Sequence, residues 1–535
     1  MQTNGFNLST VQPTSTTTLR YIGCSQDSGS FSSPAREPRA LNRPVAHPLQ
    51  TTKNDGLPYG NVGRLQHVGT LEVMASAGAY TLLLVMTLPL TALPQDSGDS
   101  GKVTELAIYT DHPRLFLLPP RLKLLRRETQ RQALRWEQFQ TLIAGNVAMP
   151  EPAFSSALFY QSSGDKDAGR RAVVWALDLK QTDLRQLALV YDWCQELLSE
   201  PENRALAERL KKAIAGAPTP RNLSNARDLL LAGIAVADQA PAESKAALGA
   251  VLQKYWPANV VSPLAKGKMP FPRSDALALL EILHATRDNL NVDLRQSFPA
   301  WFKPLALEWL LTYYPTPWPA AENEFHIPAS TDPVKDGAPD LRTAALSRAA
   351  ELALVAFDSN APETQVLQGW LMNDRFLMRG TFGIAYEFLW ANPYQPGLSY
   401  YHVPLVFRDD TLGSLFMRSS WDDDAKWLGY FSNQLQLFEL GRITVLNPEL
   451  TRGPLNLEEG VVFFGKSVRR FTVPPSKDPE RETEDVFIVG LKPRVTYSVE
   501  TDDEELDEAV SDVGGTLYFP ATRAGVTIRL APGTD

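Results

Sequence analysis

The feature that most constrains the fold of this chain is a change of hydrophobic period at NPYQPG, residues 392 to 397. Before this segment, apolar residues recur at the spacing of amphipathic helices, as in TDLRQLALVYDWCQELLS. After it, short β-branched or aromatic runs such as EDVFIVG and GVTIRL are separated by Gly, Pro, Asp and Asn, which is typical of strands. We therefore expect a multidomain chain, with helices over residues 112–392 and an antiparallel sandwich or layered sheet over residues 398–535.

The helical part contains about ten or eleven such segments, joined by short loops that carry Pro or Gly. One helix has a clear start signal, because Ser199 and Glu202 have the spacing of a capping box. Pro201 lies near its first position, where a missing N–H costs little. No repeat period is visible, so the pattern favours a helical toroid or solenoid over a four-helix bundle.

The net charge of the chain limits the classes of partner that it can be expected to bind. The formal net charge is -9, and neither the whole chain nor a long segment has the basic excess that nucleic acid or an anionic membrane would attract. We therefore expect no nucleic acid partner. A small molecule, a glycan or another protein is the expected partner.

The N-terminal region differs from the rest. Residues 1–73 are rich in Ser, Thr, Pro, Gly and Asn without a sustained period, so they are expected to be disordered or to precede the true start of translation. Met74 then opens MASAGAYTLLLVMTLPLTALPQDSG, in which an apolar run of signal-peptide length is followed by small residues around Ala92. No Lys or Arg lies between Met74 and that run. Residues 74–94 are therefore predicted to be a signal peptide, with an uncleaved membrane anchor as the alternative.

Cysteine content bears on the compartment. Beyond the leader the chain has one cysteine, Cys194, so no intrachain disulfide can form there. Export without disulfides indicates a bacterial periplasm or exterior, and we expect a periplasmic or secreted protein. Membrane contact is expected only through an uncleaved N-terminal segment.

Three consecutive aspartates lie in FMRSSWDDDAKWLGYFSN, residues 416 to 433. The residues on either side are strand-like, so Asp422 to Asp424 fall where a hairpin needs polar residues that tolerate turn geometry. A calcium loop would need a Gly at the sharp turn and a downstream bidentate Glu, and neither is at the required spacing. The sequence predicts a turn.

Three passages resemble the heparinase II/III-like polysaccharide lyases, which include alginate and heparinoid lyases. DHPRLFLLPPRLKLLRRE is similar to the family's opening, ALVYDWCQELLSEPENRALAERL to its toroid helix pair, and LGSLFMRSSWDDDAKWLGY to the first hairpin of its sandwich. The resemblance runs from about residue 111 to the C-terminus and implies an incomplete (α/α) toroid followed by an antiparallel β-sandwich. None of these passages is a catalytic motif, so the resemblance implies the fold more specifically than the activity.

The family's reaction is β-elimination at a uronic acid. The resemblance implies an Asn or His that neutralises the substrate carboxylate, a His or Tyr base and a Tyr acid. It places the neutraliser in NLSNARDLLLAGIAVAD, at Asn225 with Asn222 as the near alternative. Considered alone, both asparagines are interpreted as caps of the following helix.

The loop PTPWPAAENEFHIPAS follows a helix that ends in LEWLLTYY. Toroids of this kind bring a Tyr and other cleft residues to such a loop, which implies Tyr313, Tyr314 and His326 as candidate acid and base. Nearby aromatic residues are candidates for stacking on sugar rings or for the core: Trp309, Trp318 and Phe325. Nearby acidic residues are interpreted as solvated loop charges, with a paired-carboxylate hydrolase site as the alternative: Glu322, Glu324 and Asp332.

The chain departs from the family after the first strand hairpin. Family members usually have an H-x-H-x-D-like segment there, whereas the corresponding SNQLQLFELGRITVLNPE contains no histidine. A His-rich zinc site in the sandwich cannot be built, and no metal or other cofactor is expected. His402, in SYYHVPLVF, is the candidate base at the domain junction, with a structural histidine as the alternative.

Two functions are consistent with these patterns. The first is an exported lyase that acts by β-elimination on a uronic-acid-containing polysaccharide, with an acidic polysaccharide or oligosaccharide as its partner. The second is a non-catalytic glycan-binding or scaffold protein with a degenerate lyase fold. The lyase requires an asparagine, a tyrosine and a histidine to converge on one cleft: Asn225, Tyr313 or Tyr314, and His326 or His402.

Overall fold

The computed structural model describes residues 108–319, 324–331, 341–374, 378–447 and most of 451–532. In the last range, residues 452, 458, 467–468, 477–479 and 503–504 are not described. The predicted extension 1–73 and leader 74–94 lie outside the described residues, as do Glu322 and Asp332. Within the described part, no helix is both long enough and apolar enough to span a bilayer.

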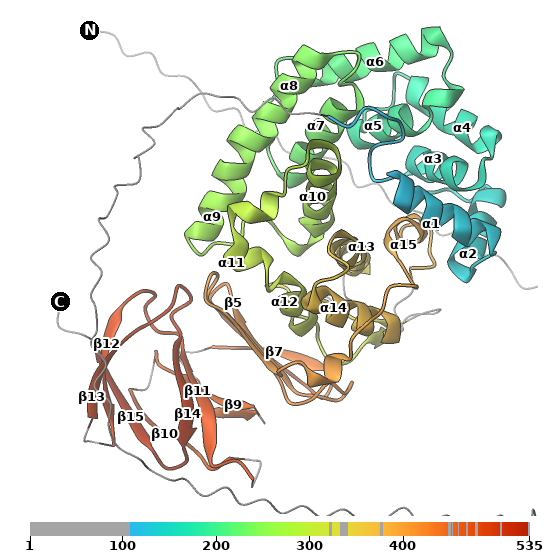
Figure 1. Ribbon diagram of the computed structural model, residues 1–535. Helices are drawn as coiled ribbons and strands as arrows, with labels where there is room; N and C mark the ends of the chain where they lie inside the picture. The colour runs from blue at the N-terminus through green and yellow to red at the C-terminus, as the bar shows by residue number, and fades with distance from the viewer. Residues whose placement is uncertain are drawn as a thin grey trace, which may run out of the picture. The chain divides into compact units, whose positions relative to one another are not determined.

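Helices occupy the first part of the described chain, as the hydrophobic period predicts (Figure 1). Their bounds are α1 (Pro119–Gln130), α2 (Leu134–Ala144), α3 (Pro152–Ser163), α4 (Lys166–Leu177), α5 (Leu184–Trp193), α6 (Glu200–Ile214), α7 (Leu223–Ala235), α8 (Pro241–Gly249), α9 (Ser262–Ala265), α10 (Ala276–Leu290), α11 (Pro299–Phe302), α12 (Leu305–Leu311), α13 (Leu341–Phe357), α14 (Pro362–Asn373) and α15 (Ile384–Trp390). Two π-helical stretches, Ala250–Tyr255 and Pro257–Val261, continue α8 toward α9.

The helices form an inner ring with a partial outer layer. In the ring, α3 packs on α5, α5 on α7, α7 on α10, α10 on α13, α13 on α15, and α15 on α3. Outer helices pack on inner ones, with α4 on α3, α6 on α5, α8 on α7 and α14 on α13 (Figure 1). Almost every side chain of α10 is buried, as expected for a helix enclosed by others. This alternation of inner and outer helices confirms the predicted helical domain.

Strands follow the helices, apart from a two-stranded pair in the loop after α12. Their bounds are β1 (Trp318–Pro319), β2 (Glu324–Phe325), β3 (Val406–Asp409), β4 (Ser414–Arg418), β5 (Trp427–Phe431), β6 (Gln434–Glu439), β7 (Arg442–Leu446), β8 (Leu455–Leu457), β9 (Gly460–Phe464), β10 (Arg470–Thr472), β11 (Thr483–Val489), β12 (Thr496–Thr501), β13 (Glu505–Val510), β14 (Leu517–Arg523) and β15 (Thr527–Pro532).

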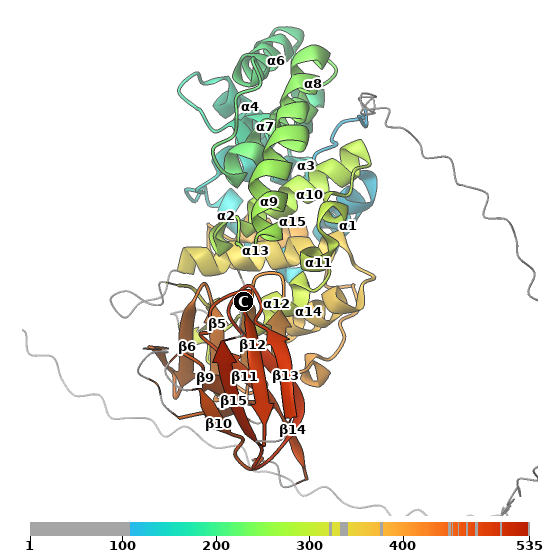
Figure 2. The ribbon, with the colours of Figure 1, turned by 90° about the vertical axis from the view of Figure 1, so that its left-hand side faces the viewer.

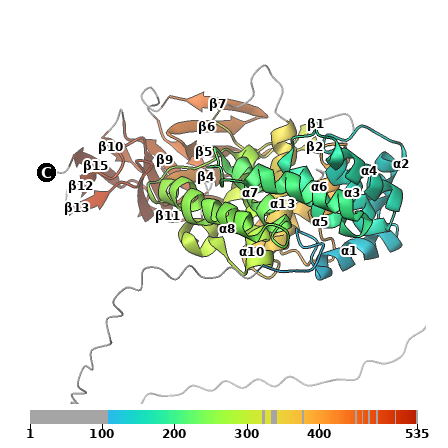
Figure 3. The same cartoon turned by 90° about the horizontal axis from the view of Figure 1, so that it is seen from above.

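The β part consists of three stacked sheets. The first is the meander β3-β4-β5-β6-β7, whose last four strands lie side by side in Figure 3. The second has the order β14-β11-β9-β8 and the third β10-β15-β12-β13 (Figure 2). The predicted helical domain followed by a β-sandwich is confirmed. Among the described strands, pairing is antiparallel except between β9 and β11, which are parallel. The second sheet contributes side chains to two separate apolar clusters.

Side chains that alternate along β4 pack into two different apolar cores. Phe416 belongs to the large helical core, whereas Leu415 and Met417 pack with the second sheet. On β5, Trp427 points to the helices and Leu428 to the second sheet. Side chains alternate between the faces of a strand, so a sheet buried on both faces needs apolar residues at successive positions. The first sheet is therefore part of the core that positions the loops of the helical domain.

Two turns of the first sheet follow from local sequence. Asp423 and Asp424 form the turn between β4 and β5, so the turn prediction is confirmed. Between β5 and β6, Ser432 and Asn433 both have positive φ, 49° and 59°. A two-residue hairpin with two positive φ values matches the right-handed twist of its strands, which favours residues such as Asn.

Candidate functional site

The loop after α12 folds back and brings two predicted site residues together. Tyr313 forms an isolated antiparallel bridge with Pro328, and the backbone N–H of Tyr314 donates to the carbonyl of Ile327 at 3.2 Å. This pairing places the His326 ring beside the Tyr313 ring, with centroids 6.5 Å apart and planes nearly perpendicular. A histidine and a tyrosine of the same loop therefore share one site.

His326 is held by a carboxylate from another helix. Its Nδ1 lies 2.7 Å from Oδ1 of Asp374, the residue that follows α14. Asp374 is fully buried and forms an ion pair with Arg348 of α13, which is also buried. The imidazole packs against Trp370, with ring centroids 5.6 Å apart. We refer to His326, Asp374 and Arg348 as the histidine cluster.

Electrostatics keep this imidazole neutral. Burial and the positive charge of Arg348 lower the pKa of His326 to about 4, and Arg418 of β4 acts in the same direction, while Asp423 opposes it. A carboxylate only accepts hydrogen bonds, so Nδ1 carries the proton and Nε2 is the basic nitrogen. Of the His326 side chain, 14% remains exposed. The arrangement therefore supplies a neutral, oriented base at physiological pH.

Tyr313 belongs to a buried hydrogen-bond network. Its side chain is 1% exposed, and its hydroxyl lies 3.1 Å from Oγ of Ser347 on α13. Arg273 donates to the same Oγ at 2.7 Å and pairs with Glu351 at 2.9 Å. Burial raises the pKa of Tyr313 well above its usual value. The hydroxyl is therefore protonated and could act as an acid rather than as a base.

Tyr314 connects the helical part to the first sheet. Its hydroxyl donates to Oε1 of Gln436 in β6 at 2.7 Å. Its ring stacks on Phe438 with centroids 5.5 Å apart, and it meets Trp427 edge to face. The side chain is 3% exposed. These contacts describe a structural role for Tyr314, and its predicted catalytic role stays a prediction.

The two candidate asparagines lie elsewhere. Asn222 is the N-cap of α7, and its side-chain oxygen accepts from the N–H of Asn225 at 2.8 Å. Asn225 lines a cavity of about 570 Å³ together with Asp183, Arg227 and Asp228. Neither the candidate tyrosines nor the candidate histidines line that cavity. The structure thus brings His326 and Tyr313 together, whereas Asn225 lines a cavity that includes neither.

The remaining candidates occupy different environments. His402 is exposed, in a short 3₁₀ turn (Tyr400–His402) at the start of the β part. Trp318 is 38% exposed in β1. Trp309 is 4% exposed, and the Arg273 guanidinium lies 4.1 Å from its ring centroid, so this ring is part of the core. Of the two tryptophans, Trp318 has the more accessible ring for stacking on a sugar.

A buried charge network at the start of the inner helices was not predicted. Arg185 of α5 pairs with Glu281 of α10 at 2.6 Å and with Glu151 at 2.8 Å. Arg227 of α7 reaches the same Glu281 at 3.1 Å. Burial alone would raise the pKa of Glu281, but the two guanidinium groups hold it below its usual range. The signal in the sequence was a charged residue on an otherwise apolar helix face, as in LEILHATRD.

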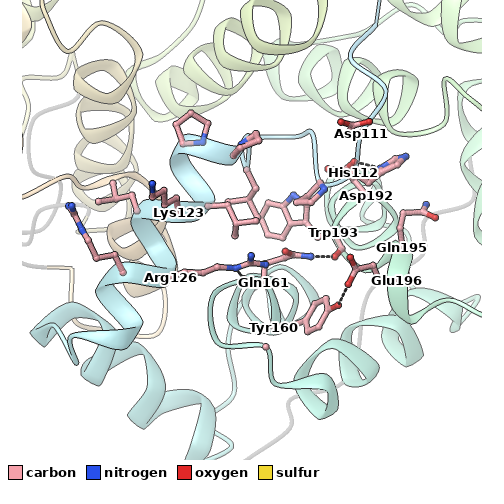
Figure 4. Close-up of a pocket in the computed structure, with 18 of the residues that line it drawn as sticks. Asp111, His112, Lys123, Arg126, Tyr160, Gln161, Asp192, Trp193, Gln195 and Glu196 are labelled. Atoms are coloured by element: carbon pink, nitrogen blue, oxygen red, sulfur yellow. Dashed lines mark hydrogen bonds and ion pairs between the residues drawn. The ribbon is translucent and has the colours of Figure 1, made fainter.

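A cavity of about 1180 Å³ lies around α1, α3 and α5 (Figure 4). His112 lies at its edge, with Nδ1 2.6 Å from Oδ1 of Asp192. The other oxygen of Asp192 accepts from the backbone N–H groups of Arg114 and Leu115. Lys123 and the other labelled residues in Figure 4 also line it. His112 and Asp192 hold the segment before α1 against α5, which is a structural role for this histidine.

Among the described residues, no group of three or more His, Cys, Asp or Glu side chains is arranged to hold a metal ion. Asp422 of the aspartate triplet instead makes local contacts: its N–H donates to Oγ of Ser420 at 3.1 Å, and its carbonyl accepts from the N–H of Ala425 at 3.2 Å. These contacts are typical of a turn.

Comparison with known proteins adds little. No protein-family model and no curated protein matches this chain. One matching solved structure is described as "Glycoside hydrolase"; it has a TM-score of 0.26 and 8% sequence identity, and the match covers 80% of this chain and 77% of that chain. A superposition that weak identifies neither a fold family nor an activity. The resemblance to heparinase II/III-like lyases stays a prediction that rests on the residues quoted for it.

Proposed function

We propose that this protein is an exported, lyase-like protein that cleaves an acidic polysaccharide by β-elimination, with His326 as the base. The observation that carries the proposal is the neutral, oriented imidazole of His326, held by Asp374. A base that removes a proton from carbon next to a carboxylate must be unprotonated at working pH and fixed in direction. His326 meets both requirements.

In the proposed reaction, Nε2 of His326 takes the proton at carbon 5 of a uronic acid. The electron pair of that C–H bond forms the double bond between carbons 4 and 5 as the bond from carbon 4 to the leaving oxygen breaks. Tyr313, whose ring meets the His326 ring edge to face, is the candidate to donate a proton to that oxygen. Arg418, whose charge acts on His326, is the candidate to neutralise the substrate carboxylate, since Asn225 lines another cavity.

A second candidate function is glycan binding without catalysis. The observation that favours it is the separation of the predicted residues: Asn225 lines a cavity that His326 and Tyr313 do not, and the Tyr313 hydroxyl is buried against Ser347. A degenerate lyase fold would keep the toroid and the exposed Trp318 while the reacting groups no longer converge. Acidic polysaccharide is the proposed partner in both cases, and a periplasmic or secreted location is proposed for both.

The test is a screen of the purified chain against polymers of uronic acids, following the ultraviolet absorbance of the unsaturated product. His326→Gln and Tyr313→Phe should each lower turnover by about a hundredfold or more, because each removes a proton-transfer group. His402→Gln is the matched control, as an exposed histidine of the same junction, and should keep parental turnover. Chelators should leave turnover unchanged.

Two results would contradict the proposal. Loss of turnover in His402→Gln, with His326→Gln unaffected, would move the base to the other histidine. Binding of uronic-acid polymers without cleavage, equal in the parent and the variants, would leave the glycan-binding function in its place. Thermal melting of each variant would separate a loss of catalysis from a loss of folding.

A further inference from the structure

A cavity of about 800 Å³ lies beside α12, between the helical part and the first sheet. It is separate from the histidine cluster, none of whose members lines it. Aromatic rings come from both sides of the cavity: Phe271, Trp301 and Trp309 from the helical part, and Phe416 and Phe431 from β4 and β5. A volume in this range is typical of small-molecule sites. Phe271 and Phe431 are partly exposed and give a ligand a stacking surface, whereas Trp301, Trp309 and Phe416 are buried in the walls.

The same cavity is lined with hydroxyl groups. They come from both the helical part and the first sheet: Ser274, Thr312, Ser414 and Ser432. Hydroxyl groups donate and accept hydrogen bonds, so they suit a ligand that has hydroxyl groups of its own. Aromatic faces combined with several hydroxyl groups match the two kinds of surface on a sugar ring, the C–H face and the hydroxyl edge.

A buried acid also lines this cavity. Glu308 of α12 is 5% exposed, and its Oε2 has no hydrogen-bond partner among the described residues. Burial and the negative charge of Asp409 raise the pKa of Glu308 to about 8, and Arg273 acts in the opposite direction. Glu308 is therefore protonated at neutral pH and holds a proton to donate. A buried polar atom without a partner costs about 1–3 kcal/mol, which a ligand could recover.

We propose that this cavity binds an uncharged sugar ring of an oligosaccharide, with the ring against the aromatic side chains and the Glu308 carboxyl donating a hydrogen bond to a sugar oxygen. An anionic ring fits less well, because the negative charge of Asp409 acts at Glu308, while Arg273 is committed to Glu351. The other cation of the lining, Lys268, is exposed to solvent. The proposal goes beyond the proposed elimination and does not depend on it, since it concerns a different cavity and binding alone.

The test is calorimetric titration of the full chain with neutral oligosaccharides of glucose, xylose, mannose and N-acetylglucosamine. At least one should bind. Glu308→Leu should weaken that binding about tenfold or more, because it removes the donor, whereas Glu308→Gln keeps a donor and should stay within about threefold of the parent. Phe271→Ala, which removes a partly exposed ring, should also weaken binding about tenfold.

A pH series adds a signature that a merely structural role would not have. As pH rises through about 8, Glu308 loses its proton, so the affinity of the parent for the neutral oligosaccharide should fall. Glu308→Gln should show no such fall, because an amide does not titrate in this range. The groups that face this carboxyl are Asp409 of β3 and Arg273 before α10, and neither is changed in the comparison.

Glu387→Gln is the matched control. It changes another buried glutamate whose pKa is raised by burial, and Glu387 does not line this cavity. Its affinity for the oligosaccharide should equal that of the parent. The proposal is overturned if no neutral oligosaccharide binds at millimolar concentration, or if both Phe271→Ala and Glu308→Leu leave the affinity unchanged. His326→Gln should not alter this binding, so the two proposals fail separately.

Discussion

At the scale of single residues, the charge state of His326 follows from the balance of its neighbours. Burial and Arg348 favour the neutral imidazole, and Asp423 favours the imidazolium. Asp374 could stabilise a positive charge on His326, but its own ion pair with Arg348 limits that effect. An isolated, exposed His–Asp pair would raise the histidine pKa, whereas here burial, and after it the charge of Arg348, lowers it.

This balance has a consequence for stability. The folded-state pKa of His326, about 4, lies below the ordinary histidine value of about 6.5. As pH falls from about 6.5 to 4, the unfolded chain binds a proton that the folded chain does not, so the free energy of unfolding decreases. The stabilising contribution is thus complete above about pH 6.5 and is lost on acidification. The loss is on the order of 3 kcal/mol across the whole window.

We therefore predict that the parent loses more stability than His326→Gln between pH 7 and about pH 4.5. Urea unfolding at several pH values measures the difference. His402→Gln, a substitution of an exposed histidine, should follow the parent. Parallel curves for the parent and His326→Gln would show that the histidine is not held neutral, and the assignment of the base would lose its support.

At the scale of elements, the sequence was most informative where local chemistry decides. The predicted capping box is present at α6: Oε2 of Glu202 accepts from both the N–H and the hydroxyl of Ser199, each at 2.8 Å. The N-cap role of Asn222 was also among the interpretations, and the structure shows that cap. Both depend on residues within one helical turn, so tertiary packing has little influence on them.

The candidate site was less predictable, because it depends on residues that are far apart in the sequence. Asp374 follows α14 and Arg348 lies on α13, and nothing in their local sequence indicates that they meet a histidine from the loop after α12. Glu308 belongs to LEWLLTYY, where a single acid at a helix start is ordinarily solvated. Their roles come from the packing of distant segments, which a single sequence does not reveal.

The cap of α6 gives a prediction at this scale. Glu202 also pairs with Arg170 of α4 at 2.7 Å, and the hydrogen bonds from Arg170 and Ser199 lower its pKa to about 2. Ser199→Ala should cost about 1 kcal/mol of stability, because a hydroxyl of the capping box is lost. Ser199→Gly, which is tolerated at N-caps, should cost only a few tenths. Chemical denaturation measures both, and equal costs would contradict a capping role.

At the scale of the whole molecule, the helical part and the first sheet share one core. Trp427 of β5 is fully buried in the helical cluster, and its Nε1 donates to the carbonyl of Leu311 at the end of α12 at 2.8 Å. The sequence predicted the order of the two parts and their classes, since the hydrophobic period changes once. Burial of β4 and β5 on both faces was not among the predictions, although the nearly continuous apolar runs SLFMR and WLGYF are typical of such strands.

A buried polar contact between the helical part and the first sheet allows a test of whether the two parts unfold together. Gln436 is fully buried; its Oε1 accepts from the Tyr314 hydroxyl, and its Nε2 donates to the carbonyl of Ser330 at 2.7 Å. Gln436→Leu should cost about 1–3 kcal/mol, because the Tyr314 hydroxyl and the Ser330 carbonyl lose their partner. Adding Tyr314→Phe should recover part of that cost, since a buried hydroxyl without a partner is then removed.

Because the core is shared, Gln436→Leu should destabilise α12 and β6 together. Hydrogen exchange of peptides from the two elements, measured at increasing urea concentration, should show the same shift of midpoint in both. If β6 opens at lower urea while α12 keeps its parental midpoint, the two parts unfold independently and the junction is only a contact surface. A common shift would instead mean that one cooperative unit holds the loop of His326 in place, so that distant substitutions in the first sheet alter the geometry of the base.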